Sequence, residues 1–390
     1  MDEGTLALDE SVVRYWPQFP DPSGGSITVR HLLAHRSGLR HWGAIDDFLS
    51  HSAAQVNDPF GLLQEFASLG LEFPPGERES YSSLGYYALG LLMEHITGQS
   101  YAELLRRRVF DPLGMSRSSL DDATTIVEGR AQAYRYNFLL ARYDNAEHRH
   151  PSTTFSTGGI LTTVDDLLRW ERALGDASLL SPGLWQTIFD PAEGESAFGW
   201  RKVTGEDPDR DIHWHGGLVT GFRSQITRMP SARRTVILFG NLRDADTNEI
   251  TDRIFEILDG QRAELPRKSL MKEVLRRVAD EGPEAAIRRF DQVLLEAAED
   301  YRTEPTQLFI AALELRSDGA CESAAPLYEH WVSVYVGNPL EWTALAHGAD
   351  CWLRVGHAEK ARRLIDRLRV GQPSNRELAS LEQRLARSRW

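Results

Sequence analysis

The sequence predicts an α+β domain, in which helices flank an antiparallel sheet, followed by an all-α helical-repeat tail. Four short strand-like runs separated by turn residues follow a helical and loop-rich region; they are 197–203, 211–215, 222–229 and 234–239. Short strands with short connections favour antiparallel pairing over a βαβ repeat. After Gly260 only helix-period segments remain. We therefore place a first domain at residues 1–260 and a helical domain at 266–390.

Helices in the first domain are indicated by capping residues. In each case a residue whose side chain can accept a hydrogen bond is followed three residues later by an acidic residue, and an amphipathic stretch comes next. Such pairs are Ser100–Glu103, Thr163–Asp166 and Asp246–Glu249. Each spacing predicts that a helix begins directly after its first residue.

The tail contains an internal repeat with a period of about 37 residues. In each copy a glycine precedes a small residue and then a large apolar one; the sets are Gly282, Ala286, Phe290; Gly319, Ala324, Tyr328; and Gly356, Ala361, Ile365. Small residues at these positions let paired helices approach closely. The third copy resembles a degenerate tetratricopeptide repeat, although a helical bundle without repeats stays open as the alternative.

Composition narrows the classes of function. The chain has 390 residues and a net charge of −13, which disfavours nucleic acid as a partner. No apolar run reaches the roughly 18 to 20 residues of a membrane span. Acidic residues follow Met1, so no signal peptide is visible and the compartment stays open. Cys321 and Cys351 are expected to be two buried thiols, with a disulfide as the alternative.

Four blocks in order resemble the class C β-lactamase-related serine hydrolases and penicillin-binding proteins. They are 27–39 (ITVRHLLAHRSGL), 73–86 (FPPG…YSSLGY), 111–115 (DPLGM) and 157–167 (TGGI…DDL). The resemblance covers about two-thirds of the chain and implies a β-lactamase/transpeptidase-like fold. It also implies acyl transfer through a serine ester, for which the family uses a Ser-x-x-Lys pair, a Tyr-x-Asn motif and a Lys-Thr-Gly-like motif.

The resemblance implies roles for two surviving motifs. Tyr81 matches the tyrosine of Tyr-x-Asn and is expected to act as a general base and acid. Ser83 stands where the family usually has Asn, and its hydroxyl has a shorter reach toward a substrate carbonyl.

The third motif is placed at His215-Gly216-Gly217, with histidine in the position of lysine. His215 is expected to supply a hydrogen-bond donor with a pH-dependent charge. Gly216 and Gly217 are expected to let the strand approach the ligand without a Cβ in the way. By analogy, the backbone N–H of Leu218 becomes an oxyanion-hole donor.

The nucleophile is missing from its expected place. In the family the Ser-x-x-Lys pair lies ahead of a block that corresponds here to residues 4–9, so the serine would fall before Met1. We expect that the start of the chain is misplaced or that the domain is truncated at its N-terminus, and that the chain as written is inactive. The one Ser-x-x-Lys present, Ser269 to Lys272, lies in the tail and would need a rearranged topology.

Two other classes of function stay open. A metal site could use the His-x-His pairs 148–150 and 213–215, with Asp144 and Glu147 near the first; the resemblance explains the second pair without metal, and no cofactor is expected. An interaction protein could use the helical tail to bind a protein partner or to dimerise. For the hydrolase, the substrate is a small molecule or peptide, with specificity expected in the loops 41–61 and 133–154.

Overall fold

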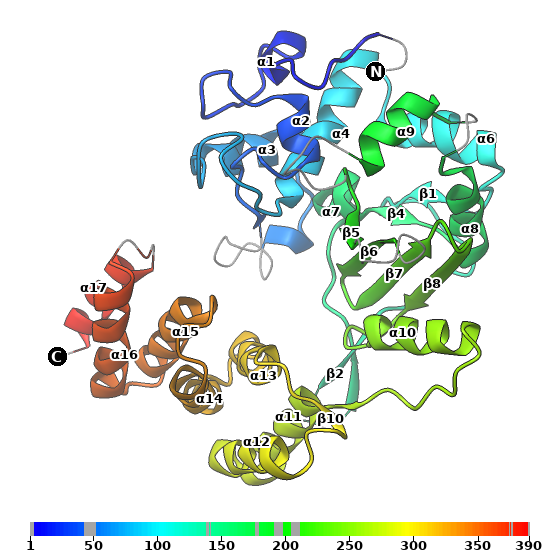
Figure 1. Cartoon of the computed structure of the whole chain (residues 1–390). Helices are drawn as coiled ribbons and strands as arrows, with labels where there is room; N and C mark the ends of the chain where they lie inside the picture. The colour runs from blue at the N-terminus through cyan, green and yellow to red at the C-terminus, as the bar shows by residue number, and fades with distance from the viewer. Residues whose placement is uncertain are drawn as a thin grey trace. The chain divides into compact units, whose positions relative to one another are not determined.

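The computed structural model describes residues 4–42, 52–137, 140, 142–175, 179–190, 198–203, 211–373, 375 and 377–388. The chain separates into two compact units (Figure 1). The first comprises residues 1–135 and 145–262, and the second comprises 136–144 and 263–390. None of the described helices is both long enough and apolar enough to cross a membrane.

Short and medium-length helices recur through the described part of the first unit. They are α1 (Val12–Tyr15), α2 (Val29–Leu33), a 3-10 turn (Ser52–Ala54), α3 (Pro59–Ser68), α4 (Ser83–Thr97), α5 (Tyr101–Leu105), a π-helical turn (Arg106–Phe110), α6 (Asp111–Leu113), α7 (Pro151–Gly158), α8 (Val164–Ala173), α9 (Pro182–Phe189) and α10 (Thr247–Leu258). The predicted caps are confirmed. Ser100, Thr163 and Asp246 each accept a hydrogen bond of 3.2 Å from the backbone N–H three residues later.

A four-stranded antiparallel sheet of order β5-β6-β7-β8 confirms the predicted meander. Its strands are β5 (Arg201–Val203), β6 (Ile212–Val219), β7 (Phe222–Met229) and β8 (Arg234–Gly240). β6 runs four residues beyond its predicted end, because pairing with β7 overrides the weak strand preference of two glycines. The predicted strand start at Ala197 and the turn residues Gly205 and Pro208 lie outside the described residues.

The other strands of the described residues form three short two-stranded pairs. β1 (Ser119–Leu120) pairs with β4 (Ile160–Leu161), and β2 (Tyr134–Asn137) pairs with β3 (Arg142–Asn145). In the second unit β9 (Lys268–Ser269) pairs in parallel with β10 (Tyr301–Arg302). The prediction that no strand follows Gly260 is therefore wrong at this one place. Two residues per strand give no periodicity to detect.

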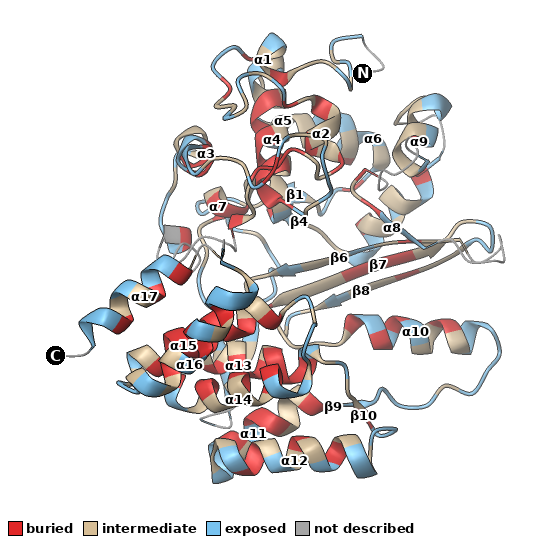
Figure 2. Cartoon of the chain, turned by 60° about the vertical axis from the view of Figure 1, so that its left-hand side comes forward, coloured by how far each residue is buried: buried red, intermediate tan, exposed pale blue. Residues whose placement is uncertain are grey.

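The core of the helical part of the first unit forms around α4, whose buried residues are red in Figure 2. Two glycines on α4 let neighbouring elements come close. A Cβ at Gly85 would lie 3.3 Å from the carbonyl oxygen of Leu32 on α2, and one at Gly90 would lie 2.3 Å from Ser156 Oγ on α7. Close approach of α2 and α7 to α4 fixes the frame in which the motif residues are held.

Helical hairpins build the second unit, which confirms the predicted all-α tail. The helices are α11 (Leu270–Glu281), α12 (Pro283–Glu296), α13 (Thr306–Ser317), α14 (Cys321–Val334), α15 (Glu341–Arg354), α16 (Ala358–Gly371) and α17 (Leu378–Arg387). The three repeat glycines lie in the turns between paired helices with positive φ, at +89°, +79° and +81°. The three repeat alanines are fully buried, as close helix pairing requires. The tetratricopeptide resemblance stays a prediction.

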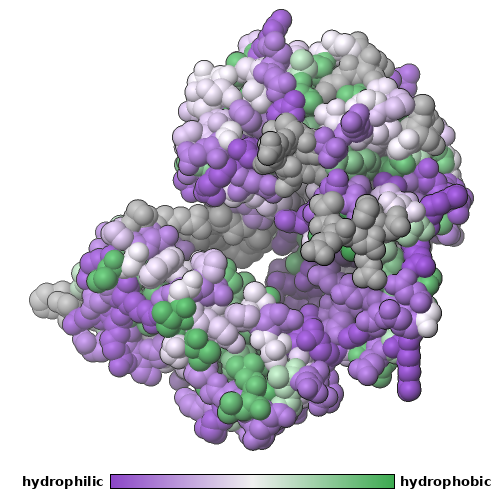
Figure 3. Space-filling model, in the orientation of Figure 1, coloured by the Kyte–Doolittle hydropathy of each residue, from purple (hydrophilic) through white to green (hydrophobic). Residues whose placement is uncertain are grey.

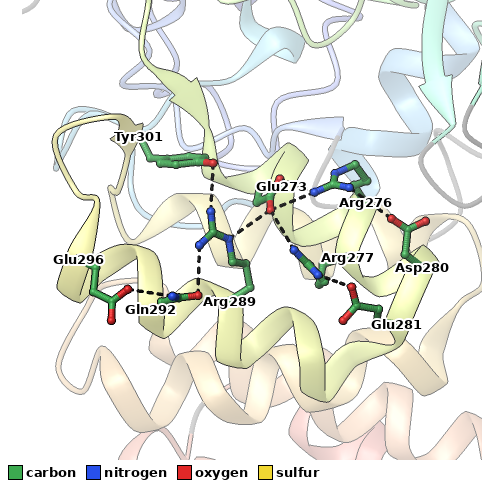
Figure 4. Close-up of polar contacts among 9 residues, drawn as sticks. All are labelled: Glu273, Arg276, Arg277, Asp280, Glu281, Arg289, Gln292, Glu296 and Tyr301. Atoms are coloured by element: carbon green, nitrogen blue, oxygen red, sulfur yellow. Dashed lines mark hydrogen bonds and ion pairs between the residues drawn. The ribbon is translucent and has the colours of Figure 1, made fainter.

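Ion pairs tie the first hairpin of the tail together (Figure 4). Glu273 on α11 lies 3.0 Å from Arg276 on the same helix and 3.2 Å from Arg289 on α12. Arg289 also donates a hydrogen bond of 3.4 Å to the Tyr301 hydroxyl on β10. Ion pairs near the surface contribute little individually, but Glu273 joins α11 to α12, and Arg289 extends the link to β10.

A buried carboxylate joins three other tail helices. Asp350 on α15 is 3% exposed. Its oxygens lie 3.1 Å from Arg316 on α13, 3.0 Å from Arg354 on α15 and 2.6 Å from Arg384 on α17. The arginines hold the pKa of Asp350 below its ordinary value although burial alone would raise it. Removing this carboxylate would leave three guanidinium groups without their shared counter-ion.

The two cysteines and the tail Ser-x-x-Lys receive structural explanations. Cys321 and Cys351 are buried on α14 and α15, with their sulfur atoms 2.8 Å apart. Ser269 is the N-cap of α11, and its Oγ accepts a hydrogen bond of 3.3 Å from the backbone N–H of Lys272. A cap requires this spacing of three residues.

Figure 3 shows that hydrophilic side chains dominate the visible surface, with hydrophobic ones in small separate groups.

Candidate active site

Tyr81 lies in the loop that leads into α4, where its side chain is 46% exposed. Its ring packs against two histidines from the segment after α2. The ring centroids are 4.6 Å from His35 and 5.4 Å from His41. The phenol is therefore held from one side by imidazole rings while it remains open to solvent.

The same two histidines cap the N-terminus of α4. The first N–H groups of a helix have no partner within the helix. The Ser82 N–H donates to His35 Nδ1 at 3.3 Å, and the Ser83 N–H donates to His41 Nδ1 at 3.3 Å. Ser83 Oγ also lies 3.0 Å from His41 Nδ1. Because Nδ1 accepts, the proton of each neutral ring is on Nε2, and the backbone beside Tyr81 is fixed.

His35 adopts a backbone conformation that is uncommon for histidine. Its φ is +55°, and its carbonyl accepts a hydrogen bond of 2.8 Å from the Ser80 N–H. Burial lowers the pKa of His35 to about 4, partly opposed by the negative charge of Glu79. The imidazole is therefore neutral at neutral pH, and it can keep accepting the Ser82 N–H there.

The β6 strand supplies the opposite part of the site. His215 is central on β6, opposite Ile226 of β7. The surrounding protein lowers the pKa of His215 by desolvation, and the positive charge of Arg201 on β5 adds to this. The charges of His215 and Arg201 both lower the pKa of His35. The structure thus brings the predicted third motif into electrostatic range of the histidine that packs on Tyr81.

The glycines after His215 are required by packing within the sheet. A Cβ at Gly217 would lie 2.4 Å from Ser224 Oγ, and one at Gly216 would lie 3.1 Å from Gln225 Oε1, both on β7. Leu218 follows with 45% of its side chain exposed. In the described residues, β5 pairs with β6 only as far as Trp214, so His215 to Val219 pair with β7 alone.

Helix α7 forms a third side, between α4 and β6. A Cβ at Gly158 would lie 3.0 Å from Val219 Cγ2 on β6, so a glycine is needed where the helix meets the strand. Phe155, inside α7, has a φ of +31°, which is strained for an aromatic residue. Its ring contacts Tyr87 on α4 at 5.3 Å between centroids. Packing on α4 holds this kink in place.

Comparison with known proteins decides the family. The model of the Beta-lactamase family matches residues 1–260, which is two-thirds of the chain. The chain belongs to the Beta-lactamase family.

Relatives of this Beta-lactamase family chain include penicillin-binding protein 4* of Bacillus subtilis, which is 27% identical over 292 residues, or 68% of this chain and 62% of that protein. Unguisins hydrolase ungD' of Aspergillus campestris is 25% identical over 248 residues, 60% of this chain and 46% of the relative. The chain thus spans about half to three-fifths of the length of these relatives.

Solved structures show the same fold. An octameric penicillin-binding protein homologue from Pyrococcus abyssi superposes with a TM-score of 0.58 at 24% identity, over 71% of this chain and 66% of that one. D-amino acid amidase from Ochrobactrum anthropi superposes with a TM-score of 0.56 at 23% identity, over 66% and 78%. The prediction of a β-lactamase/transpeptidase-like fold is confirmed.

Sequence reasoning did not single out three residues that the structure places around the predicted site residues. His35 lies inside the block that carried the resemblance, but its positive φ and its contact with Tyr81 are not visible in the sequence. His41 begins a loop to which only specificity was assigned, and residues 43–51 of that loop lie outside the described residues. Arg201 acts through its charge, which no spacing signals.

A metal site receives no support from the described part of the chain. There, no group of three or more His, Cys, Asp and Glu side chains is placed to hold a metal ion. His150 caps α7 by accepting the Ser152 N–H at 3.2 Å. His213 lies 3.2 Å from Asp211 and stacks on Phe189. Each pair of histidines thus has at least one member engaged in local packing or capping.

Proposed function

We propose that this chain carries the tyrosine and third-motif parts of a serine acyl-transfer site that acts on an ester, an amide or a D-amino-acid peptide. The observation that carries the proposal is the packing of the His35 ring on Tyr81 at 4.6 Å between centroids, with His215 on β6 close enough for its charge to lower the pKa of His35. Relatives named penicillin-binding protein and D-aminopeptidase support this range of substrates. The finer choice of substrate belongs to the loops around residues 41–61 and 133–154.

The proposed roles follow from where each group lies. Tyr81, exposed at one face of the site, takes a proton from the attacking hydroxyl and returns it to the leaving group. His215 donates a hydrogen bond to the substrate, and the Leu218 N–H stabilises the oxyanion of the tetrahedral intermediate. Ser83 is 5% exposed and already bonded to His41, so its hydroxyl contacts a substrate only while sharing that bond.

We also propose that these 390 residues form no acyl-enzyme by themselves. Their one Ser-x-x-Lys pair caps α11 in the tail, where Ser269 Oγ is engaged with the Lys272 N–H. Incubation with a fluorescent penicillin and with a fluorophosphonate, followed by peptide mapping, should label no serine. A labelled serine anywhere in the chain would overturn this statement.

The catalytic roles are tested in a chimera. A segment that carries the Ser-x-x-Lys pair implied by the family resemblance is joined ahead of Gly4, and hydrolysis of p-nitrophenyl acetate and a D-amino-acid p-nitroanilide is measured. Tyr81→Phe should lower kcat by about 100-fold or more. Tyr335→Phe removes the same hydroxyl from the end of α14 in the second unit and should change nothing. A folded chimera that Tyr81→Phe leaves at full activity would contradict the role of Tyr81.

The division into a hydrolase domain at 1–260 and a helical-repeat domain at 266–390 is likewise proposed. The separate hydrophobic cluster of the tail, built around Trp331, Tyr328 and Phe290, supports it. Limited proteolysis of the whole chain should cut first between residues 260 and 266. Preferential cleavage within α11 or α12 would contradict this boundary.

A further inference from the structure

A cavity lies in the first unit, and Tyr81 is not among its lining residues. It has a volume of about 400 Å³ and is lined by residues of α8, the end of β7, the following turn and the start of β8. In Figure 1, α8 lies beside β7 and β8. A cavity of this size is within the range that holds a small organic molecule. Arginines outnumber carboxylates among the lining residues, whereas the chain as a whole is acidic.

Four arginines line this cavity, with a single carboxylate among its walls. Glu171 lies 3.3 Å from Arg228, and it also accepts a hydrogen bond of 2.8 Å from Thr235 Oγ1. Arg234 forms an ion pair with Asp259 on α10. These two pairs account for two of the arginines, whose charges are already balanced.

The two other lining arginines are Arg172, on α8, and Arg233, in the turn after β7. Both are exposed at the rim. No ion pair joins either of them to a carboxylate within the described ranges. The cavity therefore carries two uncompensated positive charges in a chain whose net charge is −13. Two such charges match a dianion.

Arg228 forms the inner wall. Its side chain is 11% exposed, and its guanidinium lies 5.4 Å from the centre of the Phe189 ring. Its Nε faces the Glu171 carboxylate at 3.3 Å, an ion pair without hydrogen-bond geometry. A ligand oxygen that reaches this guanidinium would form a charge-assisted hydrogen bond with it.

The cavity is distinct from the acyl-transfer site. On β7, Arg228 stands opposite His213, whereas Ser224 stands opposite Gly217 of the third motif. Ile226, which stands opposite His215, is two positions from Arg228, or about 7 Å along the strand, and Ser224 is four positions away, or about 13 Å. Leu168, Leu174 and Pro230 add apolar surface beside the arginines. A ligand therefore needs both an anionic head and a small apolar part.

We propose that this cavity binds a small organic dianion, namely a phosphate monoester or a dicarboxylate with an apolar substituent. The charged head bridges Arg172 and Arg233 and approaches Arg228. The apolar part packs on the aliphatic residues between them. Binding at this site is independent of the proposed hydrolase function and needs no catalytic residue.

The probes are phenyl phosphate and phenylsuccinate, titrated into the full chain by calorimetry at pH 7.5 and low ionic strength. At least one should bind at a single site with a Kd below about 1 mM. Arg172→Gln and Arg233→Gln should each raise that Kd about tenfold. Arg14→Gln removes the same charge from an exposed pair with Glu10 and should leave the Kd unchanged.

The probe that binds more tightly identifies the chemical class of the anionic group that the cavity recognises. Tighter binding of phenyl phosphate assigns a phosphate ester, and tighter binding of phenylsuccinate assigns a dicarboxylate. Absence of binding by both probes up to about 10 mM would overturn the proposal. Equal weakening by Arg14→Gln and Arg233→Gln would overturn it as well, because the effect would then be general charge.

Discussion

Replacing His35 by Asn should flatten the dependence of stability on pH. Asparagine tolerates the positive φ of this position, and its side-chain oxygen can accept the Ser82 N–H in place of Nδ1. It cannot take up a proton. The pKa of His35 is about 4 in the folded protein and 6.5 as the ordinary value. Between these values the unfolded chain binds a proton that the folded chain does not.

The sign and the size follow from this difference. Because the unfolded state binds more protons, the stability that His35 contributes is present above pH 6.5 and is lost as the pH falls toward 4. From pH 7 to pH 5 the loss is about 2 kcal/mol in the free energy of unfolding. Burial also lowers the pKa of His41, His213 and His215, which add losses of the same sign. The Asn variant shares those, so the difference isolates His35.

The assay is a urea titration at pH 7 and at pH 5, read by a short deuterium pulse at a fixed pH. Mass spectrometry of α4 peptides then gives the fraction of the first unit that is unfolded, apart from the tail. The wild-type protein should lose about 2 kcal/mol more than the variant between the two pH values. Equal losses would refute the reasoning, as would an NMR titration that places the pKa of His35 near 6.5.

Three further predictions concern packing. Gly38→Ala should lower the free energy of unfolding by more than about 3 kcal/mol, because its φ is +75° and the new Cβ would lie 2.1 Å from a carbonyl oxygen. Gly70→Ala, at φ +74° with nothing within 4 Å, should lower it by about 1 kcal/mol. Similar losses for the two variants in the urea titration would contradict the contact at Gly38. Asp350→Asn should destabilise the tail by about 3 kcal/mol, measured by hydrogen exchange of α15 peptides, and a loss below about 1 kcal/mol would argue against the buried pairs. Diamide, which removes one hydrogen from each of two thiols, should join Cys321 to Cys351, so that titration in denaturant finds no free thiol; two remaining thiols would contradict their 2.8 Å approach.

Several elements could be predicted from local sequence patterns. Capping residues such as Thr163 and Asp246 announce helix starts locally, since a helix end must satisfy its own N–H groups. Strand β7 was placed at its observed bounds because turn residues flank it on both sides. The glycine of each tail turn was likewise readable, because a left-handed residue is required there and glycine is the cheapest solution.

The arrangement of the candidate site could not be predicted from local patterns, because its residues come from distant parts of the chain. Tyr81 and His215 are 134 positions apart in the chain, so no local pattern could indicate how they lie relative to each other. His35 was visible as part of a motif, yet its neutral charge comes from burial, which depends on every element packed around it. The cationic cavity around Arg228 has the same origin. Its arginines come from a helix, a turn and two strands, and no local pattern records that they share one space.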